Sequence, residues 1–152
     1  MIATLLPSRT MSEFLSSVQT VFVAHGWRVT AGVRNIVQVL ETTTSPISSA
    51  EICAKLEAEG RPIDLTTVYR ILDRLIAVHL LHSLHGKFIR CSDPGNRTDS
   101  HHFLMCDKCN KAEEIFLDYF KSIEQQLHRE KAFGLREVEM SFRGLCSTCR
   151  KD

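Results

Sequence analysis

Residues 65–91 decide the fold of this chain, and they read LTTVYRILDRLIAVHLLHSLHGKFIRC. Over 65–77 the apolar residues recur at steps of three and four, which predicts an amphipathic helix. The residues expected on its buried side are Leu65, Val68, Leu72 and Leu75. Two β-prone runs follow at 80–84 and 87–91, and the His85-Gly86 pair between them predicts a tight hairpin.

The same helical spacing recurs three times before this stretch. The first helix is expected from Met11 to about His25, and the second begins after Thr30, a suitable N-cap. The third is capped by Ser48 or Ser49 and ends at Gly60. Helices joined by a short turn and followed by a hairpin have the order of a winged helix-turn-helix, with 65–77 as its recognition helix.

Turn-forming residues, SDPGNR, fill 92–97, and we expect a hinge over 92–100. Beyond it the pattern mixes strands with one helix that Asp118 caps and that runs to about Lys131. The expected strands lie at 103–105, 112–117 and 135–142. The predicted fold class is therefore α+β, with a winged-helix DNA-binding domain at 1–91 and a small α/β domain at 101–152.

Composition places the chain among ordinary globular proteins. Its 152 residues are 43% hydrophobic and 24% charged, with a net charge of +1, which excludes a disordered tail, a collagen-like repeat and a histone-like polycation. No apolar run approaches the roughly 18 residues that cross a bilayer, so we expect no membrane partner. Residues 1–10 lack a signal-peptide pattern, and we expect a cytoplasmic protein whose thiols stay reduced.

Four of the six cysteines form two identical Cys-x-x-Cys spacings. They are Cys106, Cys109, Cys146 and Cys149. Two such turns give Zn²⁺ a closed tetrahedral shell of thiolates, which is typical of a structural site. The alternatives are a redox dithiol, a pair of disulfides or unrelated thiols. A redox Cys-x-x-Cys usually opens a helix in a βαβ unit, which neither pair does, and disulfides are rare in the cytosol.

A second group of metal-binding residue types surrounds the hinge. His82 and Cys91 lie on the two strands of the predicted hairpin, and the pairs His101-His102 and Glu113-Glu114 follow beyond it. Histidine, thiolate and carboxylate are the usual ligands of zinc. Chemistry alone does not separate His101 from His102, and neighbouring strand residues face opposite ways, so one of the two glutamates is expected to bind.

The sequence strongly resembles the ferric uptake regulator family of metal-sensing bacterial repressors. The matching motifs are Thr67-Val68-Tyr69-Arg70-Ile71-Leu72, Ser49-Ala50-Glu51-Ile52, the stretch from His101-His102 to Cys109, and Gly144-Leu145-Cys146 with Cys149. The resemblance extends from about Phe14 to Cys149. It implies a homodimeric repressor whose N-terminal winged helix binds a near-palindromic double-stranded operator and whose C-terminal domain dimerises.

Within the family, the resemblance is strongest to the zinc uptake regulator branch. Carried over to this chain, it implies that His82, Cys91, His101 and Glu114 bind a regulatory zinc, in addition to the structural zinc of each subunit. A thiolate ligand suits zinc better than ferrous iron. A repressor sensing iron or another metal is the alternative. This chain departs from the family at Asn110, where relatives usually have glycine, and lacks the histidine expected near Val138.

The DNA contacts are expected on the recognition helix. Tyr69 and Arg70 are placed to contact base edges in the major groove. Four further residues are assigned to phosphates or the minor groove: Thr66, Thr67, Arg74 and Arg28. Lys87 and Arg90 on the wing are expected to add backbone contacts.

Two other function classes use similar residues. A metalloenzyme would use the His/Cys/Glu group with a glutamate as base, but no H-E-x-x-H or H-x-E…P-C-x-x-C pattern occurs. The other alternative is a zinc-ribbon adaptor that binds protein in place of DNA. We predict that the chain is not an enzyme. His79 and His85 are interpreted as surface residues, and Cys53 as a small apolar core residue.

Overall fold

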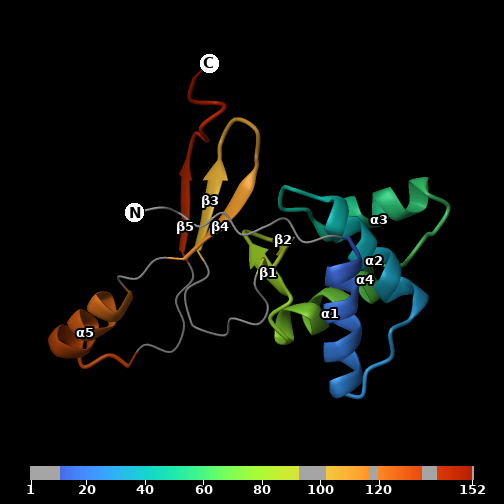
Figure 1. Ribbon diagram of the computed structural model, residues 1–152, viewed down its shortest axis with the longest axis horizontal. Coiled ribbons are helices and arrows are strands. Elements are labelled where there is room, and N and C mark those ends of the chain that lie inside the picture. The colour runs from blue at the N-terminus through green and yellow to red at the C-terminus, as the bar shows by residue number, and fades with distance from the viewer. Residues whose placement is uncertain (1–10, 93–101, 117–119, 135–139, 152) are drawn as a thin grey trace. The chain divides into compact units, whose positions relative to one another are not determined.

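The computed structural model describes residues 11–92, 102–116, 120–134 and 140–151. The chain divides into two compact units, Met1–Pro94 and Gly95–Asp152, and each is described here by itself. The first unit is mostly helical and ends in a β-hairpin, whereas the second contains three strands and one helix (Figure 1). This mixed architecture confirms the predicted α+β class and its winged helix-turn-helix.

Four helices form the first unit. They are α1 (Met11–Ala24), α2 (Ala31–Thr42), α3 (Ser49–Ala58) and α4 (Leu65–Ala77). Thr30 caps α2 by accepting from the Val33 N–H, as the sequence predicts. Of the two serines considered for α3, Ser48 is the cap, and it forms a reciprocal capping box with Glu51.

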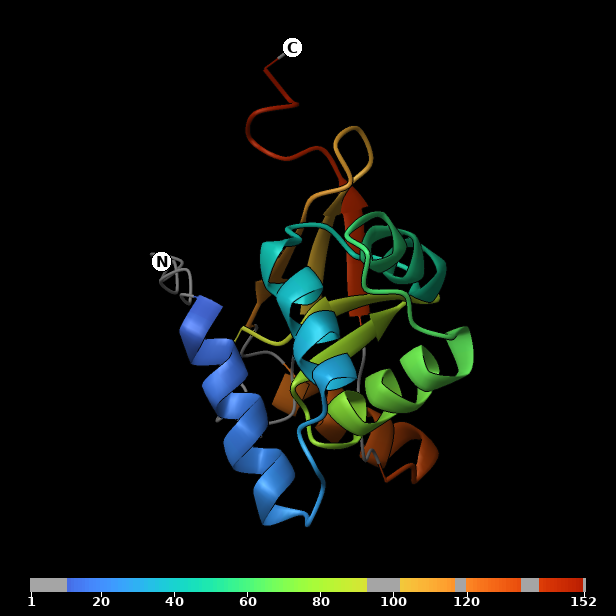
Figure 2. The same ribbon diagram turned by 90° about the vertical axis from the view of Figure 1, so that its right-hand side faces the viewer.

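The apolar core of the first unit joins all four helices, with α2 packed against α1, α3 and α4 (Figure 2). Phe14, Val18 and Phe22 fix α1 to this core, and each is fully buried. The stripe predicted for α4 is correct at Val68, Leu72 and Leu75 but wrong at Leu65, which is 46% exposed. Leu65 is the first helical residue, ahead of the turn that packs inward, and Ile71 completes the buried face in its place.

The wing is a hairpin of β1 (Leu81–Leu84) and β2 (Lys87–Arg90), with Leu84 paired to Lys87. His85 and Gly86 both have positive φ, 50° and 78°, as a two-residue type I′ turn requires. Ile47 forms an isolated β-bridge with Phe88 by exchanging two backbone hydrogen bonds, of 2.9 and 2.7 Å. The wing is therefore fastened to the segment that leads into α3.

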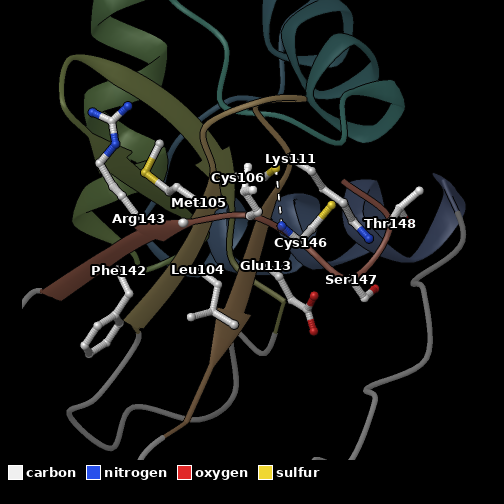
Figure 3. A pocket seen from close by; sticks show the side chains of 12 residues that line it. Leu104, Met105, Cys106, Lys111, Glu113, Phe142, Arg143, Cys146, Ser147 and Thr148 are labelled. Atoms are coloured by element: carbon white, nitrogen blue, oxygen red, sulfur yellow. Dashed lines mark hydrogen bonds between the residues drawn. The ribbon is translucent and has the colours of Figure 1, made fainter. Parts of the chain in front are cut away.

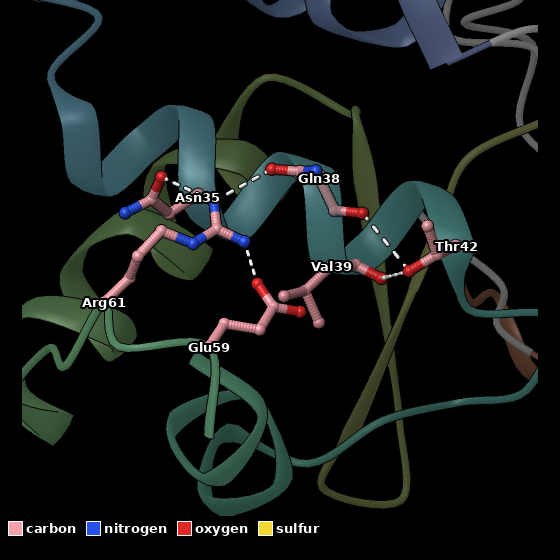
Figure 4. A network of polar contacts seen from close by, with 6 residues as sticks. All are labelled: Asn35, Gln38, Val39, Thr42, Glu59 and Arg61. Atoms are coloured by element: carbon pink, nitrogen blue, oxygen red, sulfur yellow. Dashed lines mark hydrogen bonds and ion pairs between the residues drawn. The ribbon is translucent and has the colours of Figure 1, made fainter. Parts of the chain in front are cut away.

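Arg61 joins the turn before α4 to the middle of α2 (Figure 4). Its guanidinium donates to the side-chain oxygens of Asn35 and Gln38, both at 2.9 Å, and forms an ion pair with Glu59. These contacts hold the connection between α3 and α4, and with it the start of the recognition helix, against α2.

The second unit contains a three-stranded sheet in the order β4-β3-β5. Its elements are β3 (His102–Cys106), β4 (Ala112–Ile115), α5 (Phe120–Lys131) and β5 (Met140–Gly144). β3 pairs antiparallel with β4 and parallel with β5, so that Leu104 lies between Glu113 and Phe142. Asp118 and residues 135–139 lie outside the described residues, as does most of the predicted hinge.

Among the described residues, no helix has the length and apolar character needed to cross a membrane.

Candidate metal centre and nucleic-acid interface

The four cysteines of the two Cys-x-x-Cys turns meet at one end of the sheet. Cys106 ends β3, and Cys146 follows β5 directly beside it (Figure 3). All four sulfur atoms, those of Cys106, Cys109, Cys146 and Cys149, lie within 4.8 Å of one another. The Sγ atoms of Cys109 and Cys146 are 3.8 Å apart. A Zn–S distance of about 2.3 Å gives a tetrahedral edge of about 3.8 Å, so these residues fit a structural zinc ion.

The two turns share one kind of backbone hydrogen bond. The Cys106 carbonyl accepts from the Asn110 N–H at 2.9 Å, and the Cys146 carbonyl accepts from the Arg150 N–H, also at 2.9 Å. Asn110 has a φ of 57°, in the left-handed region that glycine enters most easily. Asparagine tolerates this region better than most residues, so the departure from the family pattern leaves the turn intact.

Further contacts fasten the second turn to the first. The Asp107 N–H donates to the Gly144 carbonyl at 2.8 Å, and the Arg143 guanidinium pairs with the Asp107 carboxylate at the same distance. The Cys146 N–H donates to the Cys106 sulfur at 3.4 Å (Figure 3). Sequence reasoning did not identify Asp107 and Arg143, because an ion pair between residues far apart in the chain leaves no local pattern.

Backbone donors change the acidity of these thiols. The N–H groups of Cys146 and then Cys109 lower the pKa of Cys106 to about 6, because they stabilise its thiolate. The Cys149 N–H lowers the pKa of Cys146 in the same way. The hydrogen bond with the Cys146 side chain raises the pKa of Cys149 to about 12. Metal ligation requires thiolates, so a divalent cation bound here would displace the proton of Cys149.

His82 and Cys91 lie on the same face of the wing. His82 pairs with Ile89 in the hairpin, and Cys91 directly follows β2, two residues after Ile89, with its N–H donating to the Leu80 carbonyl at 3.0 Å. A nitrogen of the His82 ring and the Cys91 sulfur lie within 4.8 Å of one another. The wing therefore places two metal-binding side chains together.

The other residues assigned to the regulatory site lie in the second unit or outside the described residues. Glu114 pairs with Phe103 and is half-buried, whereas Glu113 pairs with Leu104 on the opposite face of the sheet. Glu113 lines a cavity of about 350 Å³ together with Leu104 and Phe142 (Figure 3). His101 lies outside the described residues, so its choice over His102 stays a prediction.

The exposed face of α4 carries most of the residues assigned to DNA. Tyr69 is 47% exposed, and Thr66 and Arg70 are exposed beside it. Thr67 differs, because its hydroxyl donates to the Asp64 carboxylate at 2.6 Å and takes part in capping α4. Arg28 is exposed in the connection between α1 and α2.

Two other residues that are predicted to contact DNA already contact side chains of the protein itself. The Lys87 ammonium on the wing lies 3.5 Å from the carboxylate of Glu51. The Arg74 guanidinium lies over the ring of Trp27, 5.4 Å from its centroid. Trp27 was missed at the sequence level, although it is the single tryptophan of the chain and directly precedes Arg28.

Comparison with known proteins gives one consistent family. The model of the ferric uptake regulator family matches residues 24–143. The ferric uptake regulation protein of Synechococcus elongatus is 24% identical over 147 residues, which cover 93% of this chain and 98% of that protein. Its counterpart in Bacillus subtilis is 25% identical over 119 residues, which cover 73% and 76%.

Solved structures agree with this fold. A zinc uptake regulator complexed with zinc and DNA superposes with a TM-score of 0.83 at 21% identity, over 94% of this chain and 97% of that one. The holo form of XcZur has a TM-score of 0.74 at 28% identity, over 94% of this chain and all of its own.

Proposed function

Because the chain belongs to the ferric uptake regulator family, we propose that it is a zinc-responsive repressor that binds operator DNA as a homodimer and controls zinc uptake genes. That the chain is a metal-responsive transcription regulator follows from its family, whose members are such regulators and not enzymes. The observation that carries the choice of zinc is the Cys91 thiol beside His82 on the wing. Thiolate ligands favour zinc over ferrous iron, which prefers nitrogen and oxygen.

Iron is the second candidate for the regulatory metal. It is favoured by the curated relatives, which are named as ferric uptake regulation proteins. Against it stands the likeness to holo XcZur, which has a TM-score of 0.74 at 28% identity. Because a thiolate ligand favours zinc over ferrous iron, replacement of Cys91 is the experiment that distinguishes the two metals.

We assign two metal ions to each subunit. Cys106, Cys109, Cys146 and Cys149 would hold a structural zinc whose shell leaves no open position. The regulatory ligands proposed are His82 and Cys91 from the wing, with His101 and Glu114 from the chain beyond residue 92. Their residue types complete a mixed histidine, thiolate and carboxylate set of the kind zinc accepts.

The proposed mechanism is a shift of population between domain arrangements. His82 and Cys91 are fixed on the wing, whose Ile47–Phe88 bridge fastens it to the helices of the first unit. A regulatory ion, when bound, would join these ligands to His101 and Glu114. The wing of each subunit would then be held against the dimerisation domain, which would set the spacing of the two recognition helices to two successive major grooves. The ion can shift the population only to the extent that it binds that arrangement more tightly than the other arrangements.

DNA binding would use the exposed face of α4. Arg70 is placed to donate to guanine O6 and N7, and Tyr69 to contact a thymine methyl group or a phosphate. Thr66, Arg74 and Arg28 would bind phosphates or enter the minor groove. The Thr67 hydroxyl is already used in capping, so its backbone N–H and side chain would serve chiefly to fix the start of the helix.

The homodimer is supported by apolar side chains on the second unit. Leu104 and Phe142 are neighbours across β3 and β5, and they are 42% and 39% exposed. Leu145, directly after β5, is 53% exposed. Exposed apolar residues gathered on one face mark protein interfaces, and a second copy of this chain is the partner that a two-fold operator requires.

The decisive experiment is metal-dependent DNA binding by the wild type and by Cys91→Ser. Fluorescence anisotropy would follow a labelled duplex from the promoter of a zinc transporter gene, with buffered Zn²⁺, with Fe²⁺ under anaerobic conditions, and with chelator. We expect Zn²⁺ to promote binding by the wild type, and Cys91→Ser to remain a folded dimer that has lost this response. Cys53→Ser is the matched control, because Cys53 packs half-buried against the core.

A normal zinc response in Cys91→Ser would remove Cys91 from the sensor. A wild type that binds DNA with Fe²⁺ at lower free metal than with Zn²⁺ would replace zinc by iron as the regulatory metal. Equal binding before and after chelation would contradict metal control altogether.

A further inference from the structure

The connection after α1 holds Trp27 in one place. Gly26 has a φ of 69°, and its N–H donates to the Val23 carbonyl at 3.0 Å. The Trp27 N–H donates to the Phe22 carbonyl at 2.8 Å, which completes a Schellman motif at the end of the helix. The indole meets the buried ring of Phe22 edge to face, with centroids 5.3 Å apart. Both the backbone and the ring of Trp27 are therefore fixed to α1.

Arg74 rests on this fixed ring. It lies one helical turn after Arg70 on α4, and its guanidinium is 5.4 Å from the indole centroid. Among the described residues, no ion pair to a carboxylate involves Arg74. A cation over the face of an indole is attracted by the ring quadrupole, and tryptophan is the strongest of the aromatic partners.

The contact connects two segments that carry predicted DNA contacts. Arg28 is the next residue after Trp27 and is exposed, and Arg74 shares its helix face with Arg70. A free arginine side chain loses much rotamer freedom when it binds a phosphate. A ring that already restricts the guanidinium lowers that loss while leaving its N–H donors available at the edge.

We propose that Trp27 is a positioning residue for DNA binding, whose indole holds the Arg74 guanidinium in place to bind an operator phosphate. This inference rests on the proposed DNA-binding function and names a residue that acts in it without touching the DNA bases. A purely structural role for Trp27, as an apolar residue packed on Phe22, is the competing explanation. The two explanations differ in whether the effect of Trp27 depends on Arg74.

The test is a double-mutant cycle on the zinc-loaded, full-length protein. The probe is a labelled duplex that the wild type selects from a random-sequence pool, and the readouts are Kd and its dependence on salt. We expect Trp27→Leu to weaken binding about two- to fivefold, which corresponds to about 0.5–1 kcal/mol. Arg74→Gln should weaken binding further and reduce the salt slope by about 0.9, as loss of one phosphate contact requires.

In the Arg74→Gln background, Trp27→Leu should have no further effect. Trp27→Phe keeps an aromatic face and should restore most of the wild-type affinity, and its thermal midpoint controls for loss of packing. Arg129→Gln on α5 removes a charge from the second unit and should leave Kd unchanged. The emission of Trp27, as the single tryptophan, should change in Arg74→Gln without any DNA present.

Equal losses from Trp27→Leu in both backgrounds would overturn the positioning role and leave DNA binding standing. Unchanged tryptophan emission in Arg74→Gln would show that the ring contact is absent in solution, which also overturns it. If the wild type selects no duplex at all, both the proposed function and this inference fail.

Discussion

Asn110 illustrates how the metal centre constrains a single residue. Its N–H donates to the Cys106 carbonyl, and its φ is 57°. A residue with a Cβ has a steric cost in the left-handed region. Glycine has no such cost, and asparagine has a smaller one than most residues. The position is thus specified by backbone geometry and not by contact with the metal.

Replacing Asn110 should reveal this steric cost. We expect Asn110→Ala to be less stable than Asn110→Gly by about 1 kcal/mol, because the Cβ of alanine carries a steric cost in the left-handed region that glycine does not. Guanidinium unfolding of the zinc-loaded proteins measures the difference. Equal stability of the two variants would show that the turn relaxes to another φ.

Arg70 carries the prediction for base recognition. Arg70→Ala should cost about 1–3 kcal/mol of specific binding and relax base preference at one operator position, because a bidentate contact to guanine is lost. Affinities for operators that differ at single positions measure this loss. An equal loss on every sequence would make Arg70 a phosphate contact instead.

At the scale of the elements, local chemistry could be predicted and long-range pairing could not. Thr30, Gly60 and the His85-Gly86 turn act within a few residues of the ends they define, so their patterns are legible in the sequence. The Ile47–Phe88 bridge involves the single residue Ile47 outside the named strands, so the sequence around it has no strand periodicity to detect. Leu65 was misplaced because periodicity does not show where the inward-facing turn begins.

The candidate site also has one part that the sequence predicts and another that it does not. The doubled Cys-x-x-Cys spacing predicts the four-cysteine cluster, since each turn positions its own pair and the two pairs are interchangeable as ligands. The parallel pairing of β3 with β5 depends on a long connection, and no spacing specifies its register. The stacking of Arg74 on Trp27 likewise joins distant segments and appeared only in the structure.

The cap of α4 gives a prediction for acid conditions. The Thr67 hydroxyl and then its backbone N–H hold the pKa of Asp64 below its ordinary value of 3.8. A lowered pKa means that the folded state favours the carboxylate, so this contribution to stability is present above about 3.8 and is lost as the pH falls through the lowered value. Asp64→Asn keeps a capping oxygen that does not titrate.

The stability of the wild type relative to Asp64→Asn should therefore decline as the pH is lowered below this range. Denaturant unfolding of both proteins at a series of pH values measures the difference, and the loss of metal in acid cancels because it affects both alike. A difference that is independent of pH would show that Asp64 does not cap the helix as a carboxylate.

At the scale of the whole molecule, the two units depend on different sources of stability. The first contains a continuous apolar core that joins all four helices. Among the described residues of the second, the buried ones are His102, Phe103, Cys106 and Ala112. So small a core needs a further constraint, and a metal held by thiolates from both turns is one that small folds commonly use.

Removal of the metal should unfold the second unit and leave the first unit folded. A strong chelator, or Cys106→Ser, should unfold the second unit and dissociate the dimer, while Trp27 in the first unit keeps its native emission. Tryptophan fluorescence, together with analytical ultracentrifugation and zinc content, measures the separation. Simultaneous loss of native Trp27 emission and of zinc would show that the two units unfold as one.

The hydrogen bond from the Asp107 N–H to the Gly144 carbonyl links the first turn of the metal centre to the end of β5. We expect that an ion held by the four sulfurs would leave when one turn moves aside, a movement that would break this bond. The escape rate of the structural ion should therefore match the rate at which the Asp107 amide exchanges with deuterium. The lifetime of the ion would then be set by the peeling of one edge strand.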